Sequence, residues 1–368
     1  MKFVIEKGLF QTGLGKIQGI AERRSTIPIL SNTVISGEKN KINIVATDLE
    51  IGVMEIIEVD KVEKGDICVP ARKLYDIVKE LSEEQVEVQR GENFWISIKA
   101  GKSVFNLPGV DPKEFPTFPS IEGAAYFTMG ASTLLDMIEK TVFAASSEES
   151  RFNLNGIYME KINKDKRDYF RMVATDGHRL SVIDKELRLT LERGIIISRR
   201  GLTELRRALG DGETEVTISL KDNNCIFKTE QTIVVIRLLE GEYPDYQQVI
   251  PKENDKHIVI ERKEFIGALR RAQVIASEKG EGVKFSIRGG TMEIRTGGPD
   301  VGNVQEEMKV DYSGDPLDVS FNARYLLDVL NIMDTEKIQM ELKEELNSGL
   351  IRPVNGEDHL YVIMPMRL

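Results

Sequence analysis

The chain has 368 residues, a formal net charge of −10, 41% hydrophobic residues and 30% charged residues. One hydrophobic core rarely serves a chain of this length, so we expect two or three domains with the composition of a soluble globular protein. The sequence has no apolar run of about 20 residues and no charged, then apolar, leader. This argues against a membrane-spanning or secreted protein and predicts a cytoplasmic one.

Three pairs of strand and helix are predicted along the chain. In each pair, a short segment of alternating apolar residues precedes a segment in which apolar residues recur at helical spacing, as in Leu134 and Ile138. The first pattern is typical of a strand and the second of a helix. The predicted strands are residues 3–5, 127–129 and 258–260, and the predicted helices are residues 9–20, 134–143 and 265–275.

A second predicted helix in each third of the chain begins with a shared motif. An apolar residue is followed by Arg three positions later and by Leu two positions after that: Val69, Arg72, Leu74; Ile197, Arg200, Leu202; and Phe321, Arg324, Leu326. We place these helices at residues 69–81, 197–209 and 321–333. The copies are 128 and 124 residues apart, and such a period indicates a repeated structural unit.

Predicted strands fill the rest of each repeat. Residues 45–48 recur at 173–176, alternating segments stand at 86–88, 216–218 and 338–340, and each repeat ends on apolar segments at 104–107, 234–239 and 360–364. About eight strands and two helices per repeat predict an α+β fold with helices packed on antiparallel sheets. Proline-containing linkers at 115–119 and 243–254 separate the repeats. We therefore predict domains at residues 1–122, 123–252 and 253–368.

The charge of the chain is unevenly distributed. Counted with their flanking residues, the six predicted helical segments sum to +7, which leaves −17 for the remainder; the segments counted are 6–24, 69–81, 130–143, 197–209, 261–273 and 321–333. Positive helices on an acidic body predict one basic surface, which is the footprint of phosphate contact. The alternative is that Arg199, Arg200, Arg206 and Arg207 form only a solvated helix face, and both interpretations stay open at this stage.

Patterns of common enzyme sites are missing from the sequence. Cys68 and Cys225 stand in strand-like runs and are expected to be buried core thiols in a reducing compartment. The sequence has no phosphate-binding loop with Lys-Ser/Thr and no dinucleotide-binding glycine pattern after a strand. His178, His257 and His359 lack neighbours at metal-ligand spacing, so we expect no metal and no cofactor.

One enzymatic alternative involves Asp176 and His178. These residues could act as an acid–base pair in a hydrolase or a nucleotidyl-transfer enzyme. Asp176 recurs as Asp48 in the first repeat, however, where no histidine follows. An aspartate that forms a turn in both repeats is the simpler interpretation. A repeat scaffold that binds only proteins is a further alternative.

Several segments resemble the bacterial DNA polymerase III beta subunit family, the replicative sliding clamps. The most informative are Val-Ala-Thr-Asp-Gly-His-Arg-Leu-Ser at 173–181 and Val-Ile-Met-Pro-Met-Arg-Leu at 362–368. Shorter matches stand at 27–30, 46–50, 70–73, 154–156, 243–246 and 327–331. Their order, their spacing and their agreement with the threefold repeat extend the resemblance over the whole chain.

The resemblance implies a non-catalytic cytoplasmic clamp that acts at replication forks and makes no membrane contact. Two chains would join head to tail as a homodimer and close a six-domain ring, with helices lining the hole and strands forming the outer wall. The ring would encircle double-stranded DNA without reading bases, because phosphate contacts position a protein but carry no sequence information. The residues expected to contact DNA are Arg24, Arg72, Lys73, Phe152, Arg199, Arg200, Arg206, Arg207, Arg270 and Arg271.

The resemblance also implies a peptide groove between the second and third domains. Short motifs with Gln and Leu-Phe-like anchors would bind there, carried by the DNA polymerase III alpha subunit, the clamp loader, other polymerases and repair proteins. Many family members have Arg where this chain has Gln248, and some have Phe near Gly280, so partner selectivity is expected to differ. The expected groove residues are Leu154, Thr175, Gly177, His178, Arg179, Leu180, Pro244, Gln248, Val249, Asn322, Tyr325, Leu346, Ser348, Val362, Met364, Pro365, Met366 and Arg367.

The dimer would join the first domain of one chain to the third domain of the other. Strand edges that pair across this contact would no longer be exposed. The residues expected at the interface are Phe105 and Leu107 on one side and Val274 and Ile275 on the other, flanked by charges such as Lys73 and Glu306.

Overall fold

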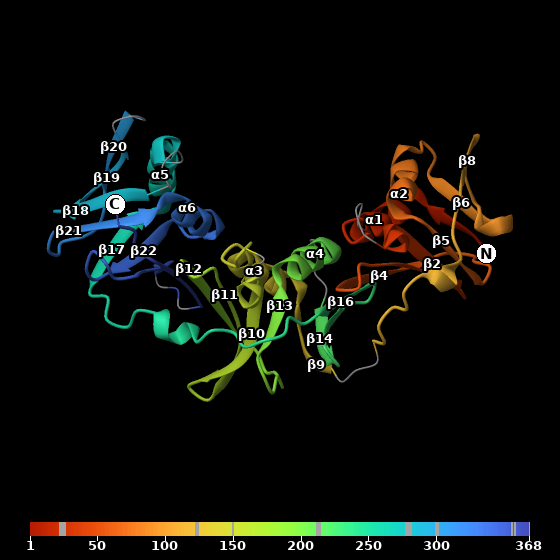
Figure 1. Ribbon diagram of the computed structural model, residues 1–368, viewed down its shortest axis with the longest axis horizontal. Helices are drawn as coiled ribbons and strands as arrows, with labels where there is room; N and C mark the ends of the chain where they lie inside the picture. Colours follow the sequence, from red (N-terminus) through yellow and green to blue (C-terminus); the bar gives the residue numbers. More distant parts are fainter. Residues whose placement is uncertain are drawn as a thin grey trace. The chain divides into compact units, whose positions relative to one another are not determined.

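The computed structural model of the chain describes residues 1–21, 27–121, 125–148, 151–210, 215–276, 282–298, 302–354, 356 and 358–367. Arg24, Gly280 and the side chain of Phe152 lie outside the described part. The chain forms two compact units (Figure 1). Unit 1 comprises Met1–Leu135 and Arg200–Leu238, and unit 2 comprises Asp136–Arg199 and Leu239–Leu368.

Unit 1 contains two antiparallel sheets and the helices α1 (Lys7–Ile17) and α2 (Ala71–Glu80), which pack side by side. Its four-stranded sheet has the order β1 (Lys2–Glu6), β6 (Gln85–Arg90), β7 (Ile96–Ala100), β8 (Ser103–Leu107). Its eight-stranded sheet has the order β5 (Gly65–Pro70), β2 (Asn32–Glu38), β3 (Lys41–Thr47), β4 (Ile51–Glu58), β16 (Thr232–Arg237), β15 (Asn224–Lys228), β14 (Glu215–Lys221), β9 (Ala125–Gly130).

Unit 2 has the same plan, with α5 (Arg262–Ala276) packed on α6 (Ala323–Ile332). Its eight-stranded sheet has the order β13 (Ile195–Ser198), β10 (Gly156–Lys164), β11 (Arg167–Thr175), β12 (Arg179–Glu186), β24 (His359–Ile363), β23 (Gly349–Pro353), β22 (Lys337–Leu342), β17 (Lys256–Glu261). Its four-stranded sheet has the order β20 (Gly302–Lys309), β19 (Thr291–Gly298), β18 (Gly282–Arg288), β21 (Leu317–Asn322). The remaining helices, α3 (Ala131–Val142) and α4 (Arg199–Leu209), each continue from one unit into the other along the chain.

The described residues confirm the predicted α+β composition. Each predicted third contains two α-helices and eight strands, and all strand pairs within its sheets are antiparallel. The predicted helix starts at 69, 197 and 321 are two residues early. Val69, Ile197 and Phe321 are the next-to-last residues of strands β5, β13 and β21 and are fully buried. The repeated motif therefore marks a junction at which a core strand turns into a helix.

The eight-stranded sheets join segments from different predicted thirds. In unit 1, β4 pairs with β16, so that Thr232 lies opposite Glu55 and Ile236 lies opposite Ile51. In unit 2, β12 pairs with β24 in the same antiparallel manner. Because these ladders cross the proposed boundaries near 122 and 252, the two compact units do not coincide with three separate domains. The predicted boundaries remain a prediction.

The predicted linkers pack against the sheets. Phe115 is buried with Val45 and Cys68 in unit 1, and Phe118 packs closely on Gly52, where a Cβ would lie 2.9 Å from the Phe118 ring. The second linker packs through Tyr246 in unit 2. Each linker therefore covers an apolar face of an eight-stranded sheet.

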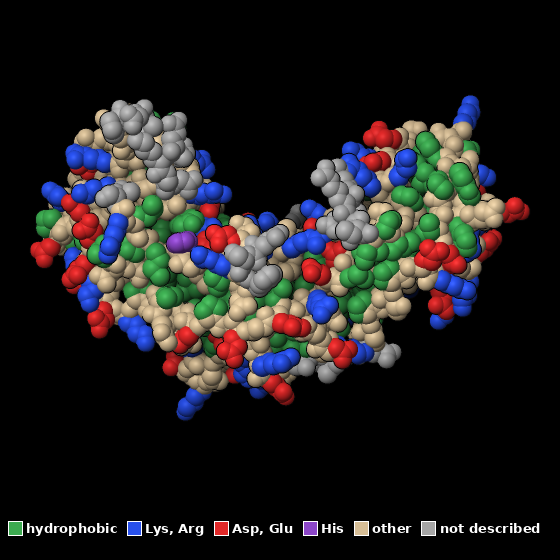
Figure 2. Space-filling model, viewed as in Figure 1, with side chains coloured by type: hydrophobic (Ala, Val, Ile, Leu, Met, Phe, Trp, Pro, Cys, Tyr) green, Lys and Arg blue, Asp and Glu red, His purple; other side chains and the backbone are tan. Residues whose placement is uncertain are grey.

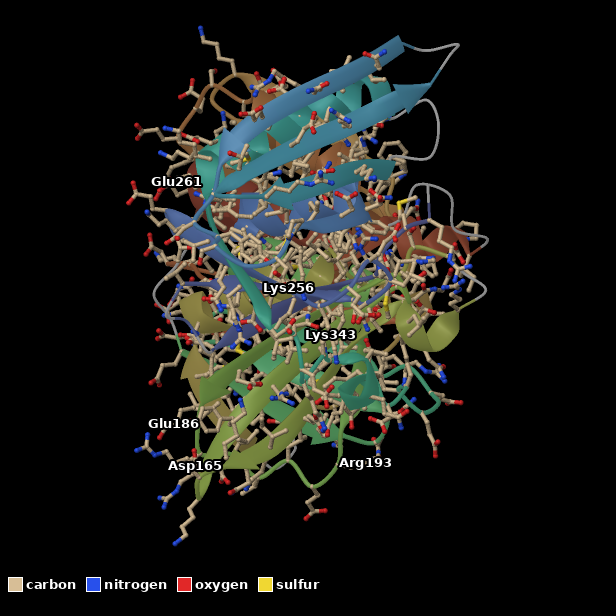
Figure 3. The ribbon with its side chains drawn as sticks, turned by 90° about the vertical axis from the view of Figure 1, so that its left-hand side faces the viewer. Asp165, Glu186, Arg193, Lys256, Glu261 and Lys343 are labelled. Atoms are coloured by element: carbon tan, nitrogen blue, oxygen red, sulfur yellow. The ribbon has the colours of Figure 1, made fainter. Side chains whose placement is uncertain are left out.

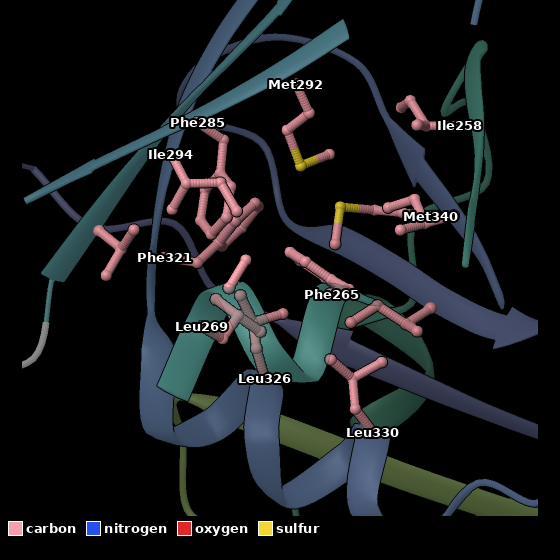
Figure 4. Packing of buried hydrophobic residues seen from close by; sticks show 14 of the residues in the cluster. Ile258, Phe265, Leu269, Phe285, Met292, Ile294, Phe321, Leu326, Leu330 and Met340 are labelled. Carbon is pink, nitrogen blue, oxygen red and sulfur yellow. The ribbon is translucent and has the colours of Figure 1, made fainter. Parts of the chain in front are cut away.

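A large core cluster of unit 2 lies between α5, α6 and the strands around them. Figure 4 shows Phe265 and Leu269 of α5 meeting Leu326 of α6 and Phe285 of β18. The prediction of buried thiols is confirmed, since Cys68 and Cys225 are free and at most 1% exposed, and burial raises the pKa of the Cys68 thiol to about 12. Among the described helices, none combines the length and apolarity needed to cross a membrane.

Candidate functional site

The turn between β11 and β12 contains Asp176 and His178, and the aspartate is a structural residue. Asp176 Oδ1 accepts hydrogen bonds from the backbone N–H groups of His178 and Arg179, at 2.9 and 3.1 Å. In the β3–β4 turn, Asp48 Oδ1 accepts bonds from the N–H groups two and three positions later, at 3.0 and 2.7 Å. The two carboxylates close equivalent turns, which confirms the turn interpretation of Asp176.

Arg179 lies at the centre of a polar network beneath this turn. Its side chain is 11% exposed. It donates to the carboxylates of Asp176 at 3.0 Å and Asp328 at 2.6 Å, and to the carbonyl oxygen of Phe143 at 2.7 Å. The guanidinium carbon also lies 4.4 Å from the centre of the Tyr325 ring. Arg179 therefore uses its charge inside unit 2, where it joins the turn to the end of α3 and to α6.

The exposed side of the turn is aromatic. The rings of His178 and Tyr325 are 6.4 Å apart, with their planes inclined by 22°. The C-terminal tail lies along the same turn, because the Met364 N–H donates to the His178 carbonyl oxygen at 2.9 Å. Farther along, the Met366 N–H donates to the Ser320 carbonyl oxygen at 2.7 Å. The tail is therefore fixed at two points, while side chains 364–366 remain half-buried.

Two predicted groove residues lie below the surface. Leu180 and Val362 are each 2% exposed and belong to an apolar cluster with Tyr246 and Leu350. They form the floor of the site and contribute almost no exposed area of their own. Tyr361 and Ile363 are also buried, as expected for a final core strand.

An open pocket of about 530 Å³ lies next to the tail. Four predicted groove residues line it: Gln248, Val249, Ser348 and Met364. The sequence analysis did not identify its other lining residues, which are Gln247, Ile250, Pro251, Lys252, Glu253, Asn254, Lys343 and Asn347; Lys343 is labelled in Figure 3. The sequence did contain a feature that could have indicated these residues, namely the proline-containing linker at 243–254, which supplies most of the pocket lining. Met364 connects the pocket to the turn that holds His178.

The other predicted groove residues have mixed roles. Asn322 caps α6 by accepting bonds from the N–H groups of Arg324 and Tyr325 at 2.9 and 3.3 Å. The Thr175 hydroxyl donates to the Arg179 carbonyl oxygen at 2.6 Å and accepts from the Gly177 N–H at 3.1 Å. These two hydrogen bonds stabilise the turn between β11 and β12. Gly177 has a φ of 89°, which favours glycine. Leu154 and Pro365 are half-buried, and Pro244, Leu346 and Arg367 are exposed.

The described DNA-contacting cations predicted in unit 1 are all at least partly exposed, and several of them pair with carboxylates of the same unit. Lys73 on α2 and Arg206 on α4 are exposed, and Arg72 is 44% exposed beside Asp76. Arg200 pairs with the Asp48 carboxylate at 2.6 Å, and Arg207 pairs with Glu204 at 2.8 Å. The charge of these two guanidinium groups is thus partly compensated within the unit.

Two predicted cations of unit 2 also have partners within their unit. Arg271 makes two bonds of 2.7 Å to the Glu306 carboxylate on β20, and Arg270 donates to the Asn331 side chain at 3.2 Å. Arg199 is exposed at the start of α4.

One cation in the helix charge count is not available at the surface. Lys16 of unit 1 is 18% exposed and pairs with the buried Glu55 carboxylate at 2.7 Å. The sum of +7 therefore overstates the basic surface of the helices.

Both four-stranded sheets end in a strand with one unpaired edge, β8 in unit 1 and β20 in unit 2. On β8, Val104 is 55% and Phe105 39% exposed, and Figure 2 shows hydrophobic side chains at the surface where β8 lies. Val274 on α5 is 71% exposed and Ile275 is half-buried. Leu107 was predicted at the interface, but it is only 6% exposed because it ends β8 against the core of its own unit. Val104 was missed.

No group of three or more His, Cys, Asp or Glu side chains within the described residues is arranged to hold a metal ion. The chain was also compared with known proteins. Three domains of the DNA polymerase III beta subunit match it: the N-terminal domain at residues 1–119, the central domain at 128–245 and the C-terminal domain at 247–367.

The relatives are clamps over their full length. The beta sliding clamps of Pseudomonas aeruginosa and Caulobacter vibrioides are 34% and 33% identical to the chain, with complete coverage of both sequences. The structure superposes on the Bartonella birtlesii clamp bound to griselimycin with a TM-score of 0.95 at 33% identity, covering 100% of each chain. The Bacillus subtilis clamp gives a TM-score of 0.93 at 30% identity, with 100% of this chain and 99% of that chain covered.

These relatives give no support to the hydrolase or nucleotidyl-transfer alternative. The three matched domains together span nearly the whole chain. The sequence repeat, the paired helices and the antiparallel sheets agree with them. The chain therefore belongs to the DNA polymerase III beta subunit family and is a DNA sliding clamp, the non-catalytic subunit that confers processivity.

Proposed function

We propose that two copies of this chain join head to tail and close a ring of six domains, with boundaries near residues 122 and 252. The observation that carries this proposal is the pair of unpaired strand edges. The exposed edge of β8 and that of β20 offer backbone groups that pair readily with another strand. In a head-to-tail ring of two chains, β8 of each chain pairs with β20 of the other. The ring then has two such contacts, and no β8 or β20 edge stays exposed. The apolar side chains of Val104, Phe105 and Val274 support the same contact.

The ring surrounds duplex DNA and holds it through phosphate contacts. Arg72, Lys73 and Arg206 are suited to this role because their side chains are exposed on α2 and α4. Such contacts are individually weak and sensitive to salt, so they permit sliding while the closed ring prevents dissociation. Arg24, Phe152, Arg199, Arg200, Arg207, Arg270 and Arg271 complete the proposed DNA-facing set.

The groove around His178, Tyr325 and the 530 Å³ pocket binds short peptide motifs of replication and repair proteins. These partners include the DNA polymerase III alpha subunit, the clamp loader and other polymerases. An apolar floor with a few polar groups suits an anchored peptide. We infer that the protein works in the bacterial cytoplasm, at replication forks on the nucleoid.

Single-particle imaging of the purified protein tests the ring. We expect a two-chain particle with an open centre and six similar lobes. A solid particle, or only single chains at micromolar concentration, would contradict the self-closing ring.

Salt-dependent DNA binding tests the phosphate contacts. Arg206→Ala should reduce the slope of log affinity against log salt by about 2, because one phosphate contact is lost in each of the two chains of the ring. Arg193→Ala is the matched control, since Arg193 is also exposed but lies outside the proposed DNA-facing set. Equal slopes for Arg206→Ala and the unmodified protein would contradict the assignment.

A further inference from the structure

The two linkers offer a comparison within one chain. Each contains aromatic-Pro-x-aromatic, at 115–118 and 243–246, so that Phe118 and Tyr246 are 128 residues apart. The sheet positions beneath them are related in the same way. Asn43 lies opposite Ile56 in unit 1, and Arg171 lies opposite Asp184 in unit 2. Equivalent positions beneath the two linkers therefore carry an uncharged pair of side chains in unit 1 and a pair of opposite charges in unit 2.

In unit 1 this place carries no charged side chain, and the linker packs beside it through apolar contacts. Phe118 packs together with Met54 and Ile56 on a cluster formed by Ile226, Ile233 and Val235. Phe118 also contacts Gly52, the counterpart of Leu180 in unit 2. Phe118 is therefore held on this kind of sheet by apolar packing.

In unit 2 the place is charged and buried. Arg171 makes two bonds to the Asp184 carboxylate, at 2.7 and 2.8 Å, and its third donor reaches the Tyr246 hydroxyl at 3.0 Å. The Tyr246 hydroxyl in turn donates to the Glu160 carboxylate. Arg171 is 12% exposed, and Asp184 and Tyr246 are each 6% exposed. We call these four residues, Glu160, Arg171, Asp184 and Tyr246, the linker latch.

The hydroxyl of Tyr246 stays protonated in this setting. Burial and the hydrogen bond to Glu160 raise the pKa of Tyr246 to about 12. The phenol can therefore donate to Glu160 while it accepts from Arg171 at neutral pH. A parallel stack of Tyr158 and Tyr243, with ring centres 5.0 Å apart and planes 7° apart, holds the start of the same linker.

A buried ion pair of this kind adds little stability over apolar packing of similar volume, because desolvation offsets the attraction. Directional bonds do, however, fix the position of a segment in a way that apolar contacts do not. Tyr246 begins the 3-10 turn Tyr246–Val249, which contains the groove residues Gln248 and Val249. Its ring packs in the same cluster as the groove floor residues Leu180 and Val362.

We propose that the linker latch positions the wall of the peptide groove, with Arg171 and Tyr246 acting as positioning residues for Gln248 and Val249. The proposal rests on the proposed function of the groove. It explains why the latch occurs in the unit that contains the groove, whereas the equivalent place in unit 1 is covered by Phe118.

The first test is Tyr246→Phe, which removes one hydroxyl and keeps the packed ring. The probe is a fluorescein-labelled short peptide that contains Gln and a Leu-Phe pair, and its dissociation rate is measured by stopped-flow anisotropy. We expect dissociation to become about five- to tenfold faster, since wall mutations act mainly on the dissociation rate. Hydrogen exchange of amides 246–250 should also become faster in this variant.

Tyr312→Phe is the matched control. Tyr312 is 7% exposed and donates one hydrogen bond to the Asp315 carbonyl oxygen at 2.7 Å, so it loses a similar interaction elsewhere in unit 2. A comparable loss of thermal stability with unchanged peptide dissociation is expected for this control. If both variants release the peptide at the same rate, the latch is only structural and the proposal is wrong.

The second test grafts the residues of this place in unit 1 into unit 2, through Tyr246→Phe, Arg171→Asn, Asp184→Ile and Glu160→Ser together. Ser36 is the counterpart of Glu160, because it lies opposite Asn43 as Glu160 lies opposite Arg171. We expect this variant to regain thermal stability relative to Tyr246→Phe while peptide release stays fast. A grafted protein that binds the peptide as tightly as the unmodified one would overturn the latch alone. Failure of the unmodified protein to bind the peptide would instead overturn the groove and, with it, the latch.

Discussion

Replacing Phe105 by Asp should separate the proposed ring into single chains. The side chains available for burial at the contact are Val104, Phe105 and Val274, with exposed fractions of 55%, 39% and 71%. Full burial of such a side chain stabilises by about 1.5–3 kcal/mol, so these fractions give roughly 3–4 kcal/mol for one interface. A head-to-tail ring contains two such interfaces, which doubles the contribution to about 7 kcal/mol.

Phe105→Asp removes roughly 1 kcal/mol of apolar burial and places a carboxylate against apolar groups, at a cost of about 2 kcal/mol or more. The loss is therefore about 3 kcal/mol for each interface and about 6 kcal/mol for the ring. This corresponds to a dissociation constant raised by roughly 10⁴-fold. The effect is large because every substitution in a two-chain ring acts twice.

Sedimentation velocity over roughly three decades of concentration measures the change in dissociation constant. A matched control is Leu346→Asp, which introduces the same charge at a 56% exposed side chain outside β8 and β20 and should leave association unchanged. Circular dichroism should show that both variants keep the native fold. If the Phe105→Asp protein stays a two-chain species wherever the unmodified protein does, the interface lies elsewhere.

Three further predictions concern stability. Lys16→Met should lower the free energy of unfolding by about 3 kcal/mol, because it leaves the 4% exposed Glu55 without its cation; in urea unfolding, Lys16→Met combined with Glu55→Leu should restore most of this loss. Leu49→Asn should raise the free energy of unfolding by about 0.5–1 kcal/mol, because leucine is strained at its φ of 77°; an unchanged or lower melting temperature would contradict this. Burial and the charge of Lys140 lower the pKa of His359 from 6.5 to about 4, so the folded state favours the neutral imidazole. Its contribution to stability should be complete above pH 6.5 and decrease as the pH falls towards 4, and His359→Gln should flatten the measured stability over this range.

Much of the architecture could be predicted because it is encoded locally. Strand and helix periodicities identified the elements around Leu134 and Phe265, and the spacing of Asp48 and Asp176 indicated two equivalent turns. Buried cysteines followed from the strand-like runs around them. The boundaries were less accurate, because Val69, Ile197 and Phe321 continue strands into the core before each helix begins. An apolar residue at such a junction fits either element, and only packing decides between them.

The sequence by itself determined the threefold repeat, the α+β class and the resemblance to sliding clamps, since all of these depend on order and spacing along the chain. Tertiary structure decided which charges remain at the surface, because Arg200 meets Asp48 and Arg271 meets Glu306 only after folding. It also decided that strands from different repeats share one sheet, and that Tyr246 meets a buried arginine where Phe118 meets isoleucine and methionine. Ion pairs and strand ladders join residues that are far apart in sequence. Periodicity assigns a side chain to a face of its element, but the partner on that face is set by the packing of the whole unit.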